Sequence, residues 1–572
     1  MVRSIKVLIA FFPFIIACQS TPKVDLLVYG GQVYSFGPEY LQAECLVIDQ
    51  GKVVAVGNAD SLRSIYSAKK EIDLQGKHLY PAWHDAHAHF AAMGKGLFEL
   101  DLKGMPSWEA CLKAIDNYVE SHPGRTWVTG RGWDQNLWRG NYPDRFVLDS
   151  LYPGKHFYLS RVDGHAALVS GNVLEQLAFT SETTIDGGAL LMDPWNDHRL
   201  KGILIDVAAD RAAEIIPEPT SQEWREALLA AQEKSIALGI AAITEAGLSL
   251  EIIQLIDSMQ KEGLLHMKFI TMLNPGPKEF EFARKGVYET SKLKVASFKL
   301  YADGALGSRG ALLKAPYCDH AEYRQGLRII SPDDPPLVKA PHRDHKENGL
   351  AVHSQAYFDS VCQIIYDLGF QANTHCIGDS ANRLILETYG RFLGGKNDRR
   401  WRIEHAQVLD LKDIPFFSKY SIVPSVQPTH ATSDMPWAEK RLCSERMAGA
   451  YAYQTLLKEA GCLPLGTDCP VEDINPMHTL LAAVFRVNTT LFPPKGFQNE
   501  EALSHFEALK GMTWWPAWAG FKENQFGGLF PGMDADFVIY AEDLQKAGPE
   551  KLVKITPEST WIDGTQRWQK GD

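Results

Sequence analysis

Short apolar runs alternate with longer stretches of helical character through the central part of the chain, from about Leu79 to Lys522. A polar side chain sits in or just after several of these runs, as in Phe298-Lys299-Leu300 and Gly466-Thr467-Asp468. Repeated strand-then-helix spacing predicts an α/β fold of the parallel (β/α)8 TIM barrel type, in which reactive residues gather at the carboxyl ends of the strands. We therefore expect the barrel over residues 79–522.

Both ends of the chain have a different pattern. Short runs such as Leu26–Tyr29 and Leu46–Ile48 are separated by Gly-containing turns, which is typical of antiparallel strands. Similar runs return at Asp536–Tyr540 and Thr560–Ile562, the latter followed by an Asp-Gly turn. We expect residues 19–78 and 523–572 to form one small β-sandwich from both termini.

Residues 100–201 interrupt the strand-and-helix alternation after the first barrel strand, and we expect them to form an insertion. This stretch contains Trp127, Trp133, Trp138 and Trp195. Aromatic side chains line ligand pockets, but they also dominate hydrophobic cores. A lid over a substrate site and a separate small core are equally compatible with this composition.

Composition and charge narrow the class of protein. The chain has 572 residues, of which 45% are hydrophobic and 22% charged, which is ordinary for a globular protein with a large core. Its net charge is −12 and it has no basic run, whereas a phosphate backbone needs clustered Lys and Arg. We exclude nucleic acid as a partner and expect a small-molecule substrate. The oligomeric state stays open.

The N-terminus has the features of an export signal. Arg3 and Lys6 precede an apolar run from Val7 to Ala17, which is shorter than the roughly 20 residues of a membrane-spanning helix. The run ends at Cys18, and the segment resembles a bacterial lipoprotein signal over residues 1–18. We expect a lipid on Cys18, anchorage to a membrane, and a location in the bacterial cell envelope, facing the periplasm or on the surface. A plain secretory peptide or an uncleaved anchor is the alternative.

Two histidines in the first apolar run are candidate metal ligands. His87 and His89 are two positions apart, so on a strand both imidazoles leave the same face. Such a pair suits a divalent ion of the zinc type, which keeps an open position for water when it is catalytic. Zinc, iron, manganese and cobalt all accept imidazole and carboxylate ligands, so the identity of the metal is open.

A series of motifs extends this observation along the chain, and in this order it resembles the amidohydrolase superfamily, within it amidohydrolase family 3, the branch that includes N-substituted formamide deformylases. The motifs are Asp85-Ala86-His87-Ala88-His89, Arg131-Gly132-Trp133-Asp134, Asp163-Gly164-His165-Ala166, Lys299–Gly304, Thr374–Asp379, Arg402–Gln407, Gln427–Trp437 and Gly466–Val471.

The resemblance implies a site for one or two divalent metal ions. The implied ligands are His87, His89, Lys299, His375, His405 and Asp468. Because a lysine ammonium has no lone pair, Lys299 would serve only after carboxylation to a bridging group. Taken singly, each residue has an ordinary alternative: Lys299 paired with Asp303, a buried His375 or His405 with satisfied nitrogens, or Asp468 in a turn.

The resemblance also implies a reaction, the hydrolysis of a non-peptide carbon–nitrogen bond in an amide, formamide or related N-acyl compound. Asp468 would act first as general base and then as general acid. Three residues match family positions near the substrate: His165, Asp303 and Trp133. The alternatives are a deaminase acting on a cyclic C=N bond and a surface binding lipoprotein without catalytic activity, since fold does not guarantee function.

Overall fold

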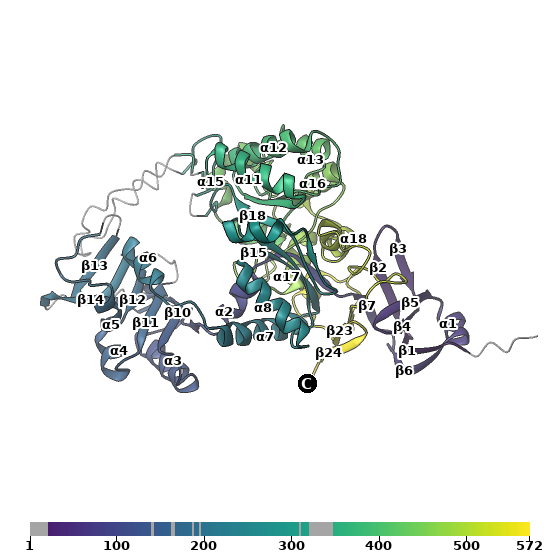
Figure 1. Cartoon of the computed structure of the whole chain (residues 1–572), viewed down its shortest axis with the longest axis horizontal. Coiled ribbons are helices and arrows are strands. Elements are labelled where there is room, and N and C mark those ends of the chain that lie inside the picture. Colours follow the sequence, from purple (N-terminus) through teal and green to yellow (C-terminus); the bar gives the residue numbers. More distant parts are fainter. Residues whose placement is uncertain are drawn as a thin grey trace, which may run out of the picture.

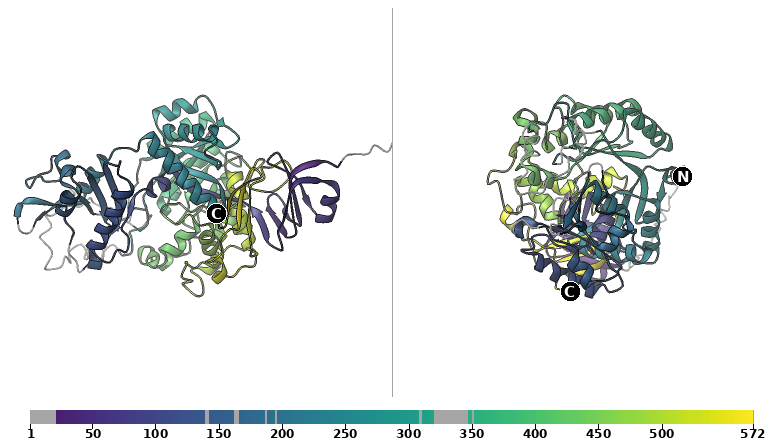
Figure 2. Two further views of the ribbon diagram at one scale, coloured as in Figure 1. Left: turned by 90° about the horizontal axis from the view of Figure 1, so that it is seen from below. Right: turned by 90° about the vertical axis from the view of Figure 1, so that its left-hand side faces the viewer.

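The computed structural model describes residues 21–138, 142–161, 166–185, 188–193, 196–307, 310–319, 347–349 and 351–571. Three parts follow one another across the longest dimension of the molecule (Figure 1). A barrel occupies the centre, and the sheets built from the chain termini and the inserted domain lie on opposite sides of it. The second view in Figure 2 shows the same arrangement.

The central barrel is parallel, as the alternating pattern predicts. Its strands, in order around the sheet, are β8 (Trp83–Ala88), β15 (Ile240–Leu248), β16 (Lys268–Leu273), β18 (Leu293–Tyr301), β19 (Gln371–Cys376), β20 (Arg402–His405) and β21 (Val423–Ser425). Every pair of neighbours in this order is parallel. All six residues of β16 are buried, because helices outside and side chains inside cover both faces of such a strand.

Residues 463–468 close the barrel between β21 and β8. The Gly466 N–H donates to the carbonyl of Val426 at 3.0 Å, and the Ala86 N–H donates to the carbonyl of Leu465 at 3.2 Å. Asp85 also accepts bonds from the backbone N–H and the hydroxyl of Thr467 at 3.0 and 2.6 Å. This segment therefore takes the place of an eighth strand and carries Asp468 to the barrel mouth.

The helices around the barrel begin and end at capping residues. In α7 (Ser221–Ala237), Thr220 and Glu223 satisfy each other's backbone N–H groups in a capping box. Helix α11 (Gln355–Leu368) ends at Gly369, whose φ of 75° is a left-handed conformation that glycine adopts without a steric penalty. Other helices that cover the barrel are α2 (Phe90–Gly96), α8 (Leu250–Lys261), α9 (Pro277–Ala283), α12 (Asp379–Leu393), α13 (Pro415–Tyr420), α16 (Tyr453–Ala460), α17 (Pro476–Phe485), α18 (His505–Gly511) and α19 (Trp514–Ala519).

Strands from both termini build a pair of sheets, as the repeated run-and-turn pattern predicts. One sheet holds β5 (Lys52–Gly57), β4 (Cys45–Asp49), β1 (Lys23–Tyr29) and β6 (Ser67–Asp73). The other holds β24 (Thr565–Gln569), β23 (Ser559–Ile562), β22 (Phe537–Tyr540), β7 (His78–Pro81), β2 (Gln32–Phe36) and β3 (Tyr40–Ala43). Buried side chains of both sheets, including Leu26, Ile48 and Phe537, form one core.

The insertion after the first barrel strand is a domain with its own mixed sheet, and it continues beyond Lys201. The sheet holds β13 (Gly188–Asp193), β14 (Asn196–Asp206), β12 (Ala166–Val169), β11 (His156–Arg161), β10 (Trp127–Trp133) and β9 (Leu100–Asp101). Its helices are α3 (Trp108–Ser121), α4 (Phe146–Leu151), α5 (Gly171–Gln176) and α6 (Val207–Glu214). Trp133 and Trp138 pack in this domain's own core, whereas Trp195 lies outside the described residues.

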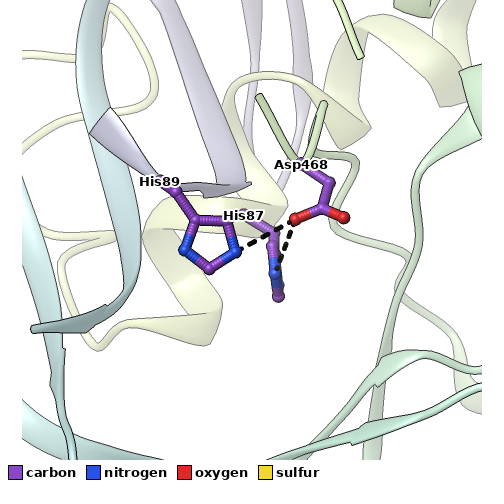
Figure 3. Close-up of side chains that lie close together, drawn as sticks. All are labelled: His87, His89 and Asp468. Atoms are coloured by element: carbon purple, nitrogen blue, oxygen red, sulfur yellow. Dashed lines mark ion pairs between the residues drawn. The ribbon is translucent and has the colours of Figure 1, made fainter. Parts of the chain in front are cut away.

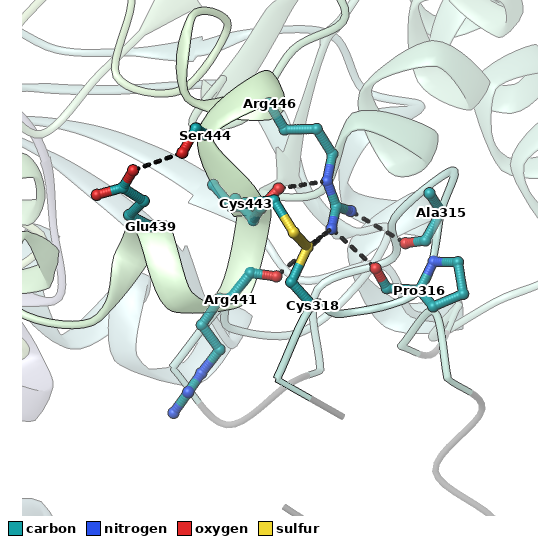
Figure 4. Close-up of a disulfide and its surroundings, with 9 residues drawn as sticks. Ala315, Pro316, Cys318, Glu439, Arg441, Cys443, Ser444 and Arg446 are labelled. Carbon is teal, nitrogen blue, oxygen red and sulfur yellow. Dashed lines mark hydrogen bonds between the residues drawn. A yellow bond between two sulfur atoms is a disulfide. The ribbon is translucent and has the colours of Figure 1, made fainter. Parts of the chain in front are cut away.

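A disulfide joins the segment after β18 to the helix α15 (Ala438–Met447). It links Cys318 to Cys443, 125 positions further along the chain. Arg446 lies beside it and donates hydrogen bonds to the carbonyls of Ala315 and Pro316 at 3.0 and 2.8 Å (Figure 4). The spacing of the cysteines does not predict this pair.

Six further cysteines of the described residues are unpaired and buried, among them Cys376 and Cys469. Within the described ranges, every helix is too short or too polar to pass through a lipid bilayer. Cys18 and the rest of the predicted signal lie outside the described residues.

Candidate metal centre

The structure brings the six candidate ligands to one end of the barrel. His87 lies near the end of β8, and His89 follows it directly. Lys299 and His375 lie near the ends of the neighbouring strands β18 and β19. The last two candidate ligands also lie at strand ends, because His405 ends β20 and Asp468 ends the closing segment. Residues more than 300 positions apart therefore share one region, at the end of the barrel where reactive residues are expected.

Asp468 is the residue that connects the histidines. Its Oδ1 lies 3.4 Å from Nε2 of His87 and 3.2 Å from Nε2 of His89 (Figure 3). Its Oδ2 lies 3.4 Å from Nε2 of His430. Burial alone would raise the pKa of Asp468, but these three histidines hold it well below its usual range. The carboxylate is therefore an anion that imidazole groups face from two sides.

His87 is held in one orientation by the buried carboxylate of Glu404. Its Nδ1 lies 2.5 Å from Oε2 of Glu404, and Glu404 is in turn 2.7 Å from the guanidinium of Arg402. Burial would raise the pKa of Glu404, but the charge of Arg402 and the contact with His87 bring it down to about 2. Because Nδ1–H donates to this carboxylate, the lone pair of Nε2 points into the site, as a metal ligand requires.

Lys299 is fully buried among these groups. Its Nζ lies 3.1 Å from Nε2 of His87, and burial lowers the pKa of its ammonium to about 8. The alternative of a pair with Asp303 is not what the structure shows. The carboxylate of Asp303 instead accepts backbone N–H bonds from Leu312, Ile377 and Gly378 at 2.8–3.0 Å. It thereby ties the segment after β18 to the end of β19.

His405 is buried and His375 is partly buried, and the two rings are adjacent, with centroids 4.4 Å apart. Burial lowers the pKa of His375 to about 3 and that of His405 well below its ordinary value, so both imidazoles are neutral. Among the described residues, Nε2 of His375, Nδ1 of His405 and Oδ1 of Asp468 have no hydrogen-bond partner. Three buried polar atoms left this way at one place are costly unless something else satisfies them.

The residues present fit a divalent cation. Ligand atoms of His87, His89 and Asp468 lie within 4.8 Å of one another, and those of His405, His430 and Asp468 do so as well. Neutral imidazole and carboxylate are the donors that zinc-type ions take. The carboxylates of Asp534, Asp536 and Asp563 also cluster. That cluster already surrounds the ammonium of the buried Lys268, so it is a structural ion-pair group.

Sequence reasoning did not assign a role to Glu404, His430 or Glu472. Nδ1 of His430 lies 3.2 Å from Oε1 of Glu472, opposite the nitrogen that faces Asp468. The two carboxylates raise the pKa of His430 to about 10 although burial opposes this. His430 lies in α14 (Pro428–Asp434), directly after β21, inside the motif Gln427–Trp437. Its place after a barrel strand was the signal that could have identified it.

The three predicted substrate residues have different outcomes. Asp303 is buried and accepts hydrogen bonds from backbone N–H groups, as described above. Trp133 is fully buried in the core of the inserted domain and donates its indole N–H to the carbonyl of Leu159 at 2.7 Å. Its surroundings therefore indicate packing, and a substrate contact stays a prediction. His165 lies outside the described residues.

The closed parallel barrel with imidazole and carboxylate groups at its mouth has the construction of a metal-dependent hydrolase. Comparison with known proteins agrees. The chain belongs to the amidohydrolase family, whose model matches residues 70–567.

Similar proteins come from plants, bacteria and archaea. The Arabidopsis thaliana protein LONG AFTER FAR-RED 3 is 30% identical over 95% of this chain and 91% of its own length. The protein YtcJ of Bacillus subtilis is 27% identical over 95% of this chain and 99% of its own. The crystal structure of an uncharacterized metal-dependent hydrolase from Pyrococcus horikoshii superposes with a TM-score of 0.75 at 24% identity, covering 92% of this chain and 99% of that one.

Proposed function

We propose that this protein hydrolyses a non-peptide carbon–nitrogen bond in a small molecule, such as an amide, a formamide or a related N-acyl compound. The observation that carries the proposal is the position of Asp468. This buried carboxylate contacts His87, His89 and His430 at the open end of a barrel whose family is the amidohydrolases.

The histidines and Asp468 would hold the divalent cation, which when bound lowers the pKa of a water molecule from 15.7 to about 7. The remaining steps belong to the chain's own residues. Asp468 takes the proton from the attacking water and delivers it to the departing nitrogen, as general base and then general acid. Glu404 keeps His87 in the tautomer that presents Nε2 to the site.

The test compares Asp468→Asn with the parent on a panel of N-formyl and N-acyl amines, with release of amine, ammonia and carboxylate measured separately. We expect a loss of roughly 10²–10⁴-fold in kcat for a general acid–base group. The matched control is Asp473→Asn in the same loop, where the side chain is 56% exposed, and it should keep the parent rate. An Asp468→Asn protein that retains metal and the parent rate contradicts the proposal.

The products also separate the alternatives. Ammonia released from cyclic C=N compounds, without turnover of any amide, would assign a deaminase. Substrate binding without release of any product would assign a binding protein.

We also propose that Lys299 is carboxylated and bridges two cations. Its complete burial next to Nε2 of His87 supports this, because a charged ammonium would repel a cation there. Mass spectrometry of the intact folded protein, prepared with bicarbonate, should show an additional 44 Da that Lys299→Ala lacks. An unmodified mass in the active protein would overturn this proposal.

We propose further that the protein is a lipoprotein of the bacterial cell envelope, with lipid on Cys18. The charged start, the apolar run and the cysteine that follows it support this. Globomycin should cause a larger precursor to accumulate in cells that express the full chain, and Cys18→Ser should give the same precursor without the drug. A precursor of unchanged size in both experiments contradicts lipidation.

A further inference from the structure

The disulfide between the segment after β18 and helix α15 fastens one wall of the barrel mouth. The described part of this segment covers residues 302–307 and 310–319. Near its start, Asp303 accepts the backbone bonds described above from residues at the end of β19. Further along, Nζ of Lys314 lies 2.9 Å from the carboxylate of Asp410, which follows β20. The segment therefore crosses the ends of β19 and β20 before the disulfide joins it to α15, which follows β21.

The segment and α15 also contact each other through side chains and backbone. Gly307 lies so close to the ring of Trp437, the residue before α15, that an added Cβ atom would be 3.3 Å from that ring. The guanidinium of Arg441 donates to the carbonyl of Gly307 at 3.2 Å, and the Cys318 N–H donates to the carbonyl of Arg441 at 3.0 Å. The position of α15 therefore determines how firmly the segment is held.

The disulfide is open to solvent and lies beside a cation. Cys318 is exposed and Cys443 is half-buried, so a thiol reagent can reach the bond. The guanidinium of Arg446 donates to Sγ of Cys318 at 3.2 Å (Figure 4). A neighbouring cation stabilises a thiolate, and thiol–disulfide exchange is faster when the departing sulfur is a stabilised thiolate. Exposed disulfides are also reduced more readily than buried ones.

The backbone of Cys443 has an unusual conformation inside α15. Its φ of 56° and ψ of 164° are angles that glycine adopts almost exclusively, whereas the helix is regular on both sides of it. Such a conformation persists only where the surrounding structure enforces it, and the disulfide is the covalent constraint at this residue. Without that constraint Cys443 can adopt helical angles. Helix α15 would then be continuous, and its first half, which carries Arg441, would point in a new direction.

We propose that this disulfide is a redox switch for substrate binding at the metal centre. In the oxidised chain α15 is kinked and the segment after β18 is fixed beside His375. In the reduced chain α15 straightens, the segment is released, and the substrate binds more weakly because binding must now order the wall. The inference rests on the proposed hydrolase for the reaction at the site, and it adds the regulation of that site.

An external dithiol supplies the electrons for the reduction. One of its thiolates attacks Sγ of Cys443 and forms a mixed disulfide, while the bond to Cys318 breaks and its electron pair stays on Sγ of Cys318. The second thiolate of the reductant then attacks its own sulfur in the mixed disulfide and releases Cys443. The reductant leaves as a cyclic disulfide, and the two protons lost by its thiols are taken up by the two cysteine sulfurs.

Hydrogen exchange tests the switch in the full chain without using activity. The native parent is compared before and after treatment with dithiothreitol, and exchange is followed by mass spectrometry of peptides. We expect the amides of residues 310–319 to exchange faster after reduction and those of residues 443–447 to exchange more slowly. Simple loosening of the structure would speed both. Titration with a chromogenic thiol reagent should detect two additional thiols in the reduced native protein.

Kinetics with a substrate found in the panel described above test the effect on the site. We expect reduction to raise KM roughly 5–150-fold, the usual range for coupling between two sites. Metal content should not change, because the candidate ligands lie outside the segment and α15. Cys443→Ala should have the high KM without treatment. Cys443→Gly also lacks the disulfide but tolerates the kink, so its KM should lie between the two. The matched control, Ser444→Ala, keeps the disulfide and should respond as the parent does.

The experiment with the untreated and reduced parent does not depend on the folding of any variant. A disulfide that resists dithiothreitol in the native protein, or the same exchange in both redox states, would overturn the switch. Release of amine with the same KM in both states refutes the switch and leaves the hydrolase intact. A parent that cleaves nothing refutes the hydrolase, and the opposite changes in exchange of the two segments then decide on the switch alone.

Discussion

Glu404→Gln tests whether a buried carboxylate controls the metal affinity of His87. The substitution preserves shape but removes the charge. If the new amide points its NH2 group at Nδ1 of His87, the imidazole must move its proton to Nε2, and the lone pair that faces the site is lost. If the amide turns the other way, its NH2 group faces the guanidinium of Arg402, where no acceptor remains.

The substitution should change both the zinc affinity of the site and the stability of the fold. Removing a supporting carboxylate weakens metal binding by roughly 10–100-fold. Arg402 also loses its counterion inside the barrel, and breaking a buried pair typically costs about 3–5 kcal/mol. Arg402 keeps hydrogen bonds to the Ala86 carbonyl at 2.7 Å and the Ser425 hydroxyl at 2.8 Å. We therefore expect the free energy of unfolding to fall by an amount near the lower end of this range, about 3 kcal/mol.

Two measurements check this prediction. Zinc affinity is obtained by competition with a chromogenic chelator, and the free energy of unfolding by urea denaturation of the metal-free protein. The matched control is Glu387→Gln, because Glu387 pairs with Arg383 on the exposed surface of α12. Such pairs contribute at most about 1 kcal/mol, so the control should change neither zinc affinity nor stability by more than that.

The pH dependence adds a third readout. The pKa of Glu404 is about 2 in the folded chain and near 4.5 when unfolded. Since the folded value is the lower one, the stability from this group is complete above pH 4.5 and is lost as the pH falls towards 2. Glu404→Gln should lack this loss. Parent zinc affinity and parent stability in the variant would refute the reasoning.

Three further predictions concern other parts of the molecule. Lys268→Met should cost roughly 3–5 kcal/mol in urea denaturation, because it leaves the buried Asp536 without a cation, although Asp534 and Asp563 keep their pairs with Lys52 and Lys292; parent stability would contradict that role. Cys318→Ser should cost about 2–4 kcal/mol by loss of the link to Cys443, and reduction should add nothing further in that variant. Burial raises the pKa of Glu245 to about 8, so the parent should lose stability as the pH rises from about 4.5 to 8, and Glu245→Gln should lack this loss.

The barrel and the terminal sheets could be predicted because the spacing of apolar residues and the composition of turns are local features of the sequence. The run Leu26–Tyr29 lies in β1, the run Asp536–Tyr540 lies in β22 apart from Asp536, and the Asp563-Gly564 turn joins β23 to β24. The end of the insertion lies beyond the predicted Lys201, because β14 continues through Gly202 to Asp206. Residues 463–468 have no regular ladder, and Pro464, which lacks an N–H, lies among them.

The role of Glu404 could not be predicted, because the rule of alternating faces fails at the end of its strand. On a regular strand, Glu404 and His405 would face opposite sides. His405 has a φ of +73° and Ala406 a φ of +42°, so the backbone turns where the strand ends and both side chains reach the site. Left-handed conformations at such residues are rare, and they leave no mark in a periodic pattern.

The pairing of β7 with β22 has a consequence for the synthesis of the chain. Trp83 donates its indole N–H to the hydroxyl of Tyr540, 457 positions later, and Tyr80 is in register with Val538 beside it. Contacts of such long range form late, after the intervening chain exists. Incomplete synthesis would therefore release a polypeptide in which the edge of β7 that normally pairs with β22 is unpaired. Strands of other chains can pair with such an edge. Shortened products of this gene should collect in inclusion bodies more readily than the complete polypeptide.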